Sequence, residues 1–482
     1  MAALALRLFF FLNFPAVTDD SSIYANLASN WMQHGVYGQM RSGQTEKQIV
    51  PTDTRLPGYP AFLAGIFWLF GAGNFKAVML TQILVDLATC LIVADLARRM
   101  VSERAARIAF MLAALCPFLA NYASAALTET LEIFFTAIAL DCAAAALNRM
   151  DVARAEARAE VRAESRAKSD ALDRTYRKLW AATGAAIAAC ILLRPDGGIL
   201  LAAIASYLAI LAWRHRTDRK KMADILVAGI IVVVIALAPL APWTIRNFRT
   251  LHHFQPLAPR YANETNELAS RGFNRWVKTW IADYASVEEI YWNVPGDKID
   301  PEKLPSRAID DPAQRDETLA VIADYNRSQD MTPELDARFG KVAEDRIRAH
   351  PGRYYVVLPL LTVADMWLRP RTEILPPDVR WWEFHDDTKQ SVLAVGFGLL
   401  NLAYVAAALL ALIPGQARRP SGIRWAGLLI SFLLLRSAFL GTLENPEPRY
   451  TLECYPAIIV LASSLFSPRD NRPRLSGNEA PG

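Results

Sequence analysis

Apolar residues along this 482-residue chain fall into long blocks separated by polar stretches. Most blocks are about 17 to 24 residues long, close to the roughly 20 residues that an α-helix needs to cross a bilayer. This pattern predicts an all-α integral membrane protein. The blocks lie at 1–17, 58–73, 76–97, 105–122, 125–147, 179–194, 197–213, 223–243, 353–368, 390–413, 425–443 and 451–466.

Loops rich in Lys and Arg indicate which ends of the blocks face the cytoplasm. Such loops occur at 98–107, 149–178, 214–221 and 418–424. All four fall on one side only if two blocks, 58–73 and 353–368, lie in the outer interface instead of crossing. We therefore expect about ten spans with both termini cytoplasmic. An arrangement of twelve spans breaks the charge rule and is kept as the alternative.

The first block is a marginal span because it contains Arg7 and Pro15, and the chain could begin further upstream. A signal peptide is the rival interpretation, but the block lacks a basic leader and an Ala-x-Ala-like cleavage site. Composition adds that 53% of residues are hydrophobic and that the net charge is only +4. So small a charge, with basic residues clustered beside apolar blocks, gives no reason to expect a nucleic-acid partner.

The threading divides the chain into four predicted regions. Residues 1–243 form a transmembrane catalytic module with an external loop at 18–75 and a charged cytoplasmic helix at 149–178. Residues 244–389 form an external cap with an interfacial helix at 353–368. Residues 390–466 form a group of C-terminal transmembrane helices, and residues 467–482 form a disordered tail.

Five polar motifs face outward under this threading, so acidic and basic side chains converge on one side of the membrane. They lie at 18–28, 127–130, 194–197, 242–247 and 447–450. Asp20, Tyr24 and Ala28 follow one another at intervals of four residues, and Arg-x-Pro-Gly-Tyr-Pro follows at 55–60. This order resembles the first external loop of the GT-C glycosyltransferases, in the branch of the dolichyl-phosphate-mannose-protein mannosyltransferases and aminoarabinose transferases (glycosyltransferase family 39 or related).

The resemblance implies roles for individual residues. Asp20 has the family spacing to Tyr24 and takes the role of general base. Many relatives have Asp-Glu here, whereas this chain has Asp19-Asp20-Ser21, so Asp19 is the candidate for the second carboxylate. The alternative for Asp20 is that it only caps the following helix. The residues implied in donor binding are Tyr24, Arg55, Glu129, Arg194, Arg246, Arg436, Arg449 and Tyr450.

Several of these assignments have structural alternatives. Glu129 could be a satisfied polar residue at a helix start, and the arginines near the outer interface could extend their charged ends to water without touching donor. Arg436 lies inside the apolar block 425–443, where a charge must be paired or line a cavity. It could bind a lipid phosphate, or pair with an embedded acid such as Asp86 or Asp141.

The resemblance implies a GT-C fold and transfer of a monosaccharide from a polyprenyl-phosphate donor to a hydroxyl of a protein, lipid or glycan. The reaction would be a single inverting displacement on the external face of a bacterial inner or plasma membrane. A flippase or transporter of lipid-linked sugars, and an envelope polysaccharide polymerase or ligase using diphosphate donors, are the alternatives. No cofactor is predicted, and because His252 and His253 have no third ligand at useful spacing, no metal site is predicted either.

Overall fold

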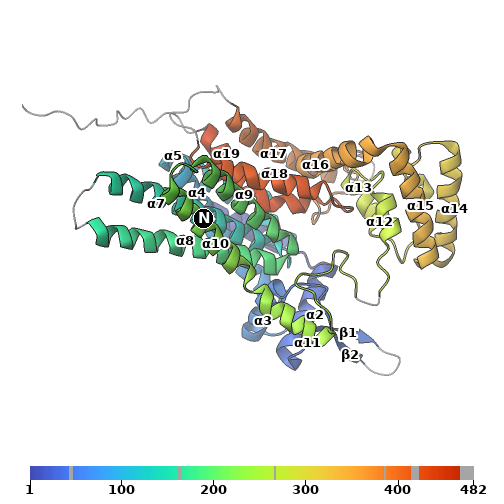
Figure 1. Ribbon diagram of the computed structural model, residues 1–482. Coiled ribbons are helices and arrows are strands. Elements are labelled where there is room, and N and C mark those ends of the chain that lie inside the picture. The colour runs from blue at the N-terminus through green and yellow to red at the C-terminus, as the bar shows by residue number, and fades with distance from the viewer. Residues whose placement is uncertain (43–46, 160–164, 265–266, 385–386, 414–422, 467–482) are drawn as a thin grey trace, which may run out of the picture.

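The computed structural model describes residues 1–482 except 43–46, 160–164, 265–266, 385–386, 414–422 and 467–482, and gives no side-chain environment for 41–47 and 152–174. The chain is almost entirely helical (Figure 1). The single sheet among the described residues is a hairpin in which β1 (Gly38–Ser42) pairs antiparallel with β2 (Lys47–Pro51), with Gly38 opposite Pro51. The all-α class predicted from the sequence is therefore confirmed.

The N-terminal half forms the helix bundle and the first external loop. Its helices are α1 (Ala2–Asn13), α2 (Asp19–His34), α3 (Gly58–Phe70), α4 (Phe75–Met100), α5 (Glu103–Ala114), α6 (Pro117–Tyr122), α7 (Glu129–Ala159), α8 (Ser165–Leu193), the 3-10 turn η1 (Pro195–Gly197), α9 (Gly198–Arg214), α10 (Arg219–Leu237) and α11 (Leu240–Leu251). Part of the charged stretch predicted at 149–178 lies on the end of α7 and part on the start of α8, and its side chains lie mostly outside the described residues.

The C-terminal half contains a small helical cap and the last bundle helices. The cap comprises α12 (Arg271–Val277), α13 (Tyr284–Ser286), η2 (Val287–Tyr291), η3 (Pro301–Lys303), η4 (Ser306–Ala308), α14 (Pro312–Ser328) and α15 (Pro333–Ala349). The chain then returns through η5 (Arg353–Val357), α16 (Leu358–Leu368), α17 (Thr388–Leu412), α18 (Ala426–Leu440), η6 (Pro448–Cys454) and α19 (Tyr455–Leu465).

Within the described residues, six helical segments are long and apolar enough to cross a membrane: Phe75–Met100, Glu129–Asp151, Thr175–Leu193, Pro195–Arg214, Arg219–Leu251 and Thr388–Leu412. The two blocks predicted to lie in the interface form the short helices α3 and α16, of 13 and 11 residues. At 1.5 Å per residue they are about 16–20 Å long, against about 30 Å of hydrocarbon. The other four predicted spans also contain helices shorter than a full crossing.

Three of the predicted cytoplasmic loops gather at one end of the bundle. The Arg424 N–H donates to the carbonyl of Met100 at 2.9 Å, and the indole N–H of Trp425 donates to Asn148 Oδ1 at 3.0 Å. The Asn148 amide in turn donates to the carbonyl of Arg99 at 3.2 Å. Because α7 begins at Glu129 at the opposite end, the basic loops and the polar motifs occupy opposite ends of the bundle, as the threading requires.

The cap has its own hydrophobic core, separate from that of the bundle. Trp276, Trp280 and Phe339 are fully buried in it, with an edge-to-face contact between the two indoles at 5.3 Å between ring centroids. In Figure 1 the helices α12, α14 and α15 lie at the far end of the molecule from the free ends of α7 and α8. The cap therefore stands over the end of the bundle that carries the polar motifs.

Candidate active site

Thr18, rather than an aspartate, caps helix α2. Its hydroxyl accepts a hydrogen bond from the backbone N–H of Ser21, and the Ser21 hydroxyl accepts one from the backbone N–H of Thr18 at 3.0 Å. This reciprocal arrangement satisfies the first turn without a carboxylate. The expectation that Asp20 could serve only as the cap is therefore wrong. Asp20 lies in the first turn, where the positive end of the helix dipole favours a negative charge.

The Asp20 carboxylate lies between two arginines from distant parts of the chain. Arg55 Nη2 is 3.2 Å from Oδ1, and Arg449 Nη2 is 3.5 Å from Oδ2. Burial alone would raise the pKa of Asp20, but the charges of Arg449 and Arg55 outweigh it and hold the pKa below its ordinary value. Asp20 is thus ionised at neutral pH and remains about one-third exposed, so an acceptor can reach it.

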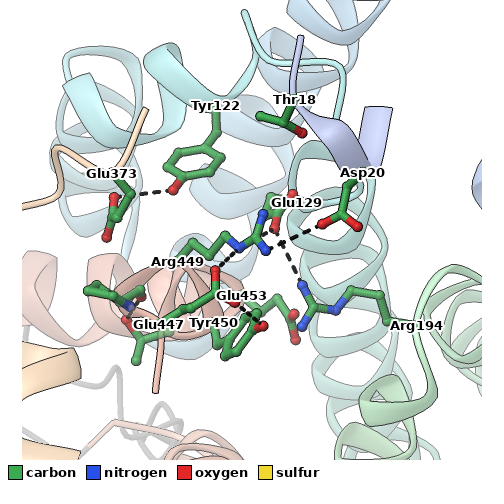
Figure 2. Close-up of polar contacts among 12 residues, drawn as sticks. Thr18, Asp20, Tyr122, Glu129, Arg194, Glu373, Glu447, Arg449, Tyr450 and Glu453 are labelled. Atoms are coloured by element: carbon green, nitrogen blue, oxygen red, sulfur yellow. Dashed lines mark hydrogen bonds and ion pairs between the residues drawn. The ribbon is translucent and has the colours of Figure 1, made fainter. Parts of the chain in front are cut away.

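Arg449 connects Asp20 to two further carboxylates. Figure 2 shows its guanidinium between Asp20, Glu129 and Glu447. Its Nε lies 3.7 Å from Glu129 Oε1, and it forms a close ion pair with Glu447. Glu447 also accepts a hydrogen bond from the Tyr450 hydroxyl. The segment that begins η6 thus brings a cation and an anion to the start of α2 and of α7.

Arg194, which follows the last residue of α8, also contacts this group of carboxylates. Its guanidinium lies 3.4 Å from Glu129 Oε1 and donates to both carboxylate oxygens of Asp196, at 3.1 and 3.2 Å. It also stacks on the Tyr450 ring, with 4.6 Å from Cζ to the ring centroid. Contacts therefore join five of the predicted residues in one cluster, Asp20, Arg55, Glu129, Arg194 and Arg449, and Tyr450 stacks on one of its arginines.

Arg436 is fully buried beneath this cluster and has different partners from those expected. Its Nη2 lies 2.8 Å from Asp196 Oδ2 and 2.8 Å from Glu453 Oε1. The acids named from the sequence are occupied elsewhere: Asp86 pairs with Arg7 at 2.7 Å, and Asp141 pairs with Arg99 at 2.8 Å. The expected partners are therefore wrong, because chain separation alone cannot show which embedded acid faces Arg436.

Three predicted site residues lie outside the cluster contacts. Arg246 donates to the backbone carbonyls of Thr52 and Tyr37, at 2.8 and 2.5 Å, and so fastens α11 to the first external loop. Tyr24 is buried one turn after Asp20, packed edge-to-face on another tyrosine. Asp19 is exposed at the start of α2. Their geometry indicates support for the site more than direct contact with a ligand.

Sequence reasoning missed several acids and a tyrosine. Glu447 and Asp196 lie inside motifs that the sequence shows, but the neighbouring arginines, and not these acids, were predicted to be site residues. Tyr122 donates to Glu373 Oε2 at 3.2 Å on the far side of the site, and no local motif marks either residue (Figure 2). Glu132, one turn after Glu129, is fully buried with no hydrogen bond to either carboxylate oxygen.

Of the two adjacent histidines, His253 has an acidic partner. His253 Nε2 lies 2.7 Å from Asp53 Oδ2, which joins the segment after α11 to the first external loop. Within the described residues, no group of three or more His, Cys, Asp and Glu side chains is arranged to hold a metal ion.

The arrangement supplies the groups that a transfer from a phosphate leaving group requires. Asp20 is an ionised, accessible carboxylate that contacts the guanidinium groups of Arg55 and Arg449, and Arg194 contacts the neighbouring Glu129. Such cations stabilise negative charge that develops on a departing phosphate. The cluster lies at the end of the bundle over which the cap stands (Figure 1).

In fold, the chain is similar to the archaeal oligosaccharyltransferase AglB from Archaeoglobus fulgidus in complex with an inhibitory peptide and a dolichol-phosphate, with 13% identity, a TM-score of 0.46, and coverage of 96% of this chain and 50% of that one. It is also similar to ArnT from Cupriavidus metallidurans bound to undecaprenyl phosphate, with 14% identity, a TM-score of 0.38, and coverage of 96% and 75%.

The chain thus spans half of the archaeal enzyme's length. A comparison with curated protein sequences finds no match. A family model does match, and its segment includes Arg55 and Glu129 and ends within α7. Over residues 53–153 the chain matches the family described as dolichyl-phosphate-mannose-protein mannosyltransferase, which confirms the resemblance predicted from the first external loop.

Proposed function

We propose that this protein transfers a monosaccharide from a polyprenyl-phosphate donor to an acceptor hydroxyl on the external face of the membrane. The observation that carries the proposal is the position of Asp20, ionised between Arg55 and Arg449 where the bundle meets the cap. The family match over residues 53–153 supports the class of reaction. The basic loops at the opposite end of the bundle support an external site.

The proposed step is one displacement at the anomeric carbon. The acceptor oxygen forms a bond to this carbon while its proton passes to an Asp20 carboxylate oxygen. The bond between the anomeric carbon and the phosphate oxygen breaks, and the polyprenyl phosphate leaves with the bonding electrons. Attack opposite the leaving group inverts the configuration. Asp20 supplies general-base catalysis, typically a factor of about 10² to 10⁴.

The arginines are proposed to stabilise the leaving phosphate to different extents. Arg55 has the most accessible guanidinium of the cluster, with 23% of its side chain exposed and Asp20 as its ion-pair partner. Arg449 and Arg194 are each shared among carboxylates and 16% exposed. We assign Arg55 and Arg449 to the phosphate, since both also touch the base and would bring base and leaving group to the same sugar.

Arg436 is proposed to position this machinery without touching donor. Its side chain is fully buried and donates to the carbonyl of Tyr450 at 3.1 and 3.2 Å, while also pairing with Asp196. It therefore ties the η6 segment, which carries Arg449, to the turn that follows Arg194. A shift of these turns would displace Arg449 and Arg194.

The test is an Asp20→Asn variant in purified protein supplied with polyprenyl-phosphate and polyprenyl-diphosphate sugars. Transfer should fall about 10²- to 10⁴-fold while undecaprenyl phosphate still binds, because the amide keeps the shape of the side chain but cannot accept the proton. Asp19→Asn is the matched control, exposed in the same turn, and should be milder. Near-normal transfer by Asp20→Asn would remove Asp20 from the role of base. Preference for diphosphate donors would instead indicate a polymerase or ligase.

A further inference from the structure

A polar cavity of about 800 Å³ lies beside the candidate active site, between the segment after α11 and the cap. Its lining comes from the 253–264 segment, from α12, from Tyr354 and from Glu444. No part of the proposed chemistry uses it. The cavity is large enough for a sugar-sized group and has mainly polar and aromatic side chains on its walls, unlike a site for a lipid tail.

Two loops lead from the walls of this cavity directly to Asp20. On one side, His253 is hydrogen-bonded to Asp53, two residues before Arg55, which pairs with Asp20. On the other side, Glu444 lies three residues before Glu447. Glu447 pairs with Arg449, and Arg449 also contacts Asp20. The cavity is therefore flanked by the two segments that carry the ion-pair partners of Asp20.

The charge of the cavity is positive and partly uncompensated. Arg260 pairs with Glu444 at 2.6 Å. Arg271, the first residue of α12, and Arg275, one turn later, have no acidic partner in the part of the chain that the structure describes, and both are exposed. With Glu264 as the second acid of the lining, three arginines against two glutamates leave one net positive charge. Guanidinium forks match phosphate and carboxylate geometry.

We infer that this cavity binds an anionic group of the acceptor, a phosphate or a carboxylate, while the acceptor hydroxyl meets Asp20. This assignment rests on the proposed function. Arg271 and Arg275 supply the unpaired charge, and Tyr261 and Tyr354 supply the surfaces on which a sugar ring packs. The acceptor is thus an acidic glycan or a phosphorylated sugar, and a neutral hydroxyl compound is a poorer substrate.

The test measures binding of small probes to the full chain in nanodiscs of zwitterionic lipid. Glucose 6-phosphate, glucuronate and glucose are titrated against wild type, Arg271→Gln/Arg275→Gln, and the control Arg327→Gln/Arg348→Gln, whose arginines are 76% and 70% exposed on the cap. At least one anion should bind wild type about tenfold more tightly than glucose, and the first variant should lose this preference. The stronger anion tells phosphate from carboxylate.

Three outcomes would overturn the inference. They are equal binding of glucose and both anions, an unchanged preference in Arg271→Gln/Arg275→Gln, and an equal loss in the control variant. Undecaprenyl phosphate affinity, measured on the same proteins, separates the two proposals. If the Arg271→Gln/Arg275→Gln variant binds it more weakly than wild type, the cavity belongs to the donor. If wild type does not bind it at all, the proposed function fails while the anion preference can still stand.

Discussion

Removing the Arg436 charge should destabilise the protein because two carboxylates depend on it. Arg436 is fully buried, and its Nη2 lies 2.8 Å from both Asp196 and Glu453. Breaking a buried ion pair by removing one partner typically costs about 3 to 5 kcal/mol. The entropy of unfolding of a chain of this length is about 1 kcal/mol per kelvin. Arg436→Met should therefore lower the melting temperature by about 3 to 5 °C.

The assay is thermal unfolding of purified protein in detergent, followed by intrinsic tryptophan fluorescence. Arg98→Met is the control, because Arg98 is 45% exposed and its pair with Asp95 contributes less than about 1 kcal/mol. Adding Glu453→Gln to Arg436→Met should recover most of the loss. Asp196 still has Arg194 as a cation, whereas the structure gives Glu453 no second ion-pair partner among its described residues.

Two results would refute this reasoning. Arg436→Met protein that melts like wild type would show that the buried pairs do not hold the segment. A double variant that melts no higher than Arg436→Met would show that Glu453 is not the acid left uncompensated.

The remaining predictions concern the base, its helix and the threading. Arg55→Gln removes a cation that lowers the pKa of Asp20, so the acidic limb of the pH profile of kcat/KM should move to higher pH; an unmoved limb would contradict the assigned electrostatics. Thr18→Ala should cost about 1 kcal/mol and lower kcat, as unfolding and steady-state assays can show; unchanged stability would argue against the cap. In a cysteine-free background, a cysteine at Ser328 should react with an impermeant thiol reagent in intact cells, and one at Arg216 should not; the reverse would invert the threading.

Local spacing predicted the part of the site that local geometry determines. Asp20 could be singled out because it stands four residues before Tyr24, the spacing of the family that the sequence resembles, and Arg449 because it precedes the last helix in a motif. The partners of Arg436 could not be predicted, since Asp196 lies 240 residues away and only helix packing selects it over Asp86. The cap of helix α2 could not be predicted for a different reason. Thr18 and the two aspartates are all suitable capping residues, and the structure uses Thr18 because it exchanges hydrogen bonds with Ser21.

The membrane spans were also predicted correctly only where local sequence determines the structure. Blocks such as 76–97 and 390–413 became full-length helices because their apolar runs are continuous. The block at 105–122 contains a proline, and the structure divides it into α5 and α6 at Cys116 and Pro117. Proline is favourable in the first turn of a helix, so a second helix begins at this residue. Hydropathy alone does not detect this break and predicts one span where the chain forms two helices.

The separate hydrophobic core of the cap has a consequence for how such a protein can diversify. Trp276 and Phe339 pack within the cap, while the residues proposed to act on the donor are anchored in the bundle and in η6. Substitutions on the surface of α12 therefore alter what meets the cavity without disturbing the packing that holds Asp20 and Arg449. A lineage could exchange one acceptor for another by mutating a few exposed positions, while its lipid carrier and its chemistry stayed the same.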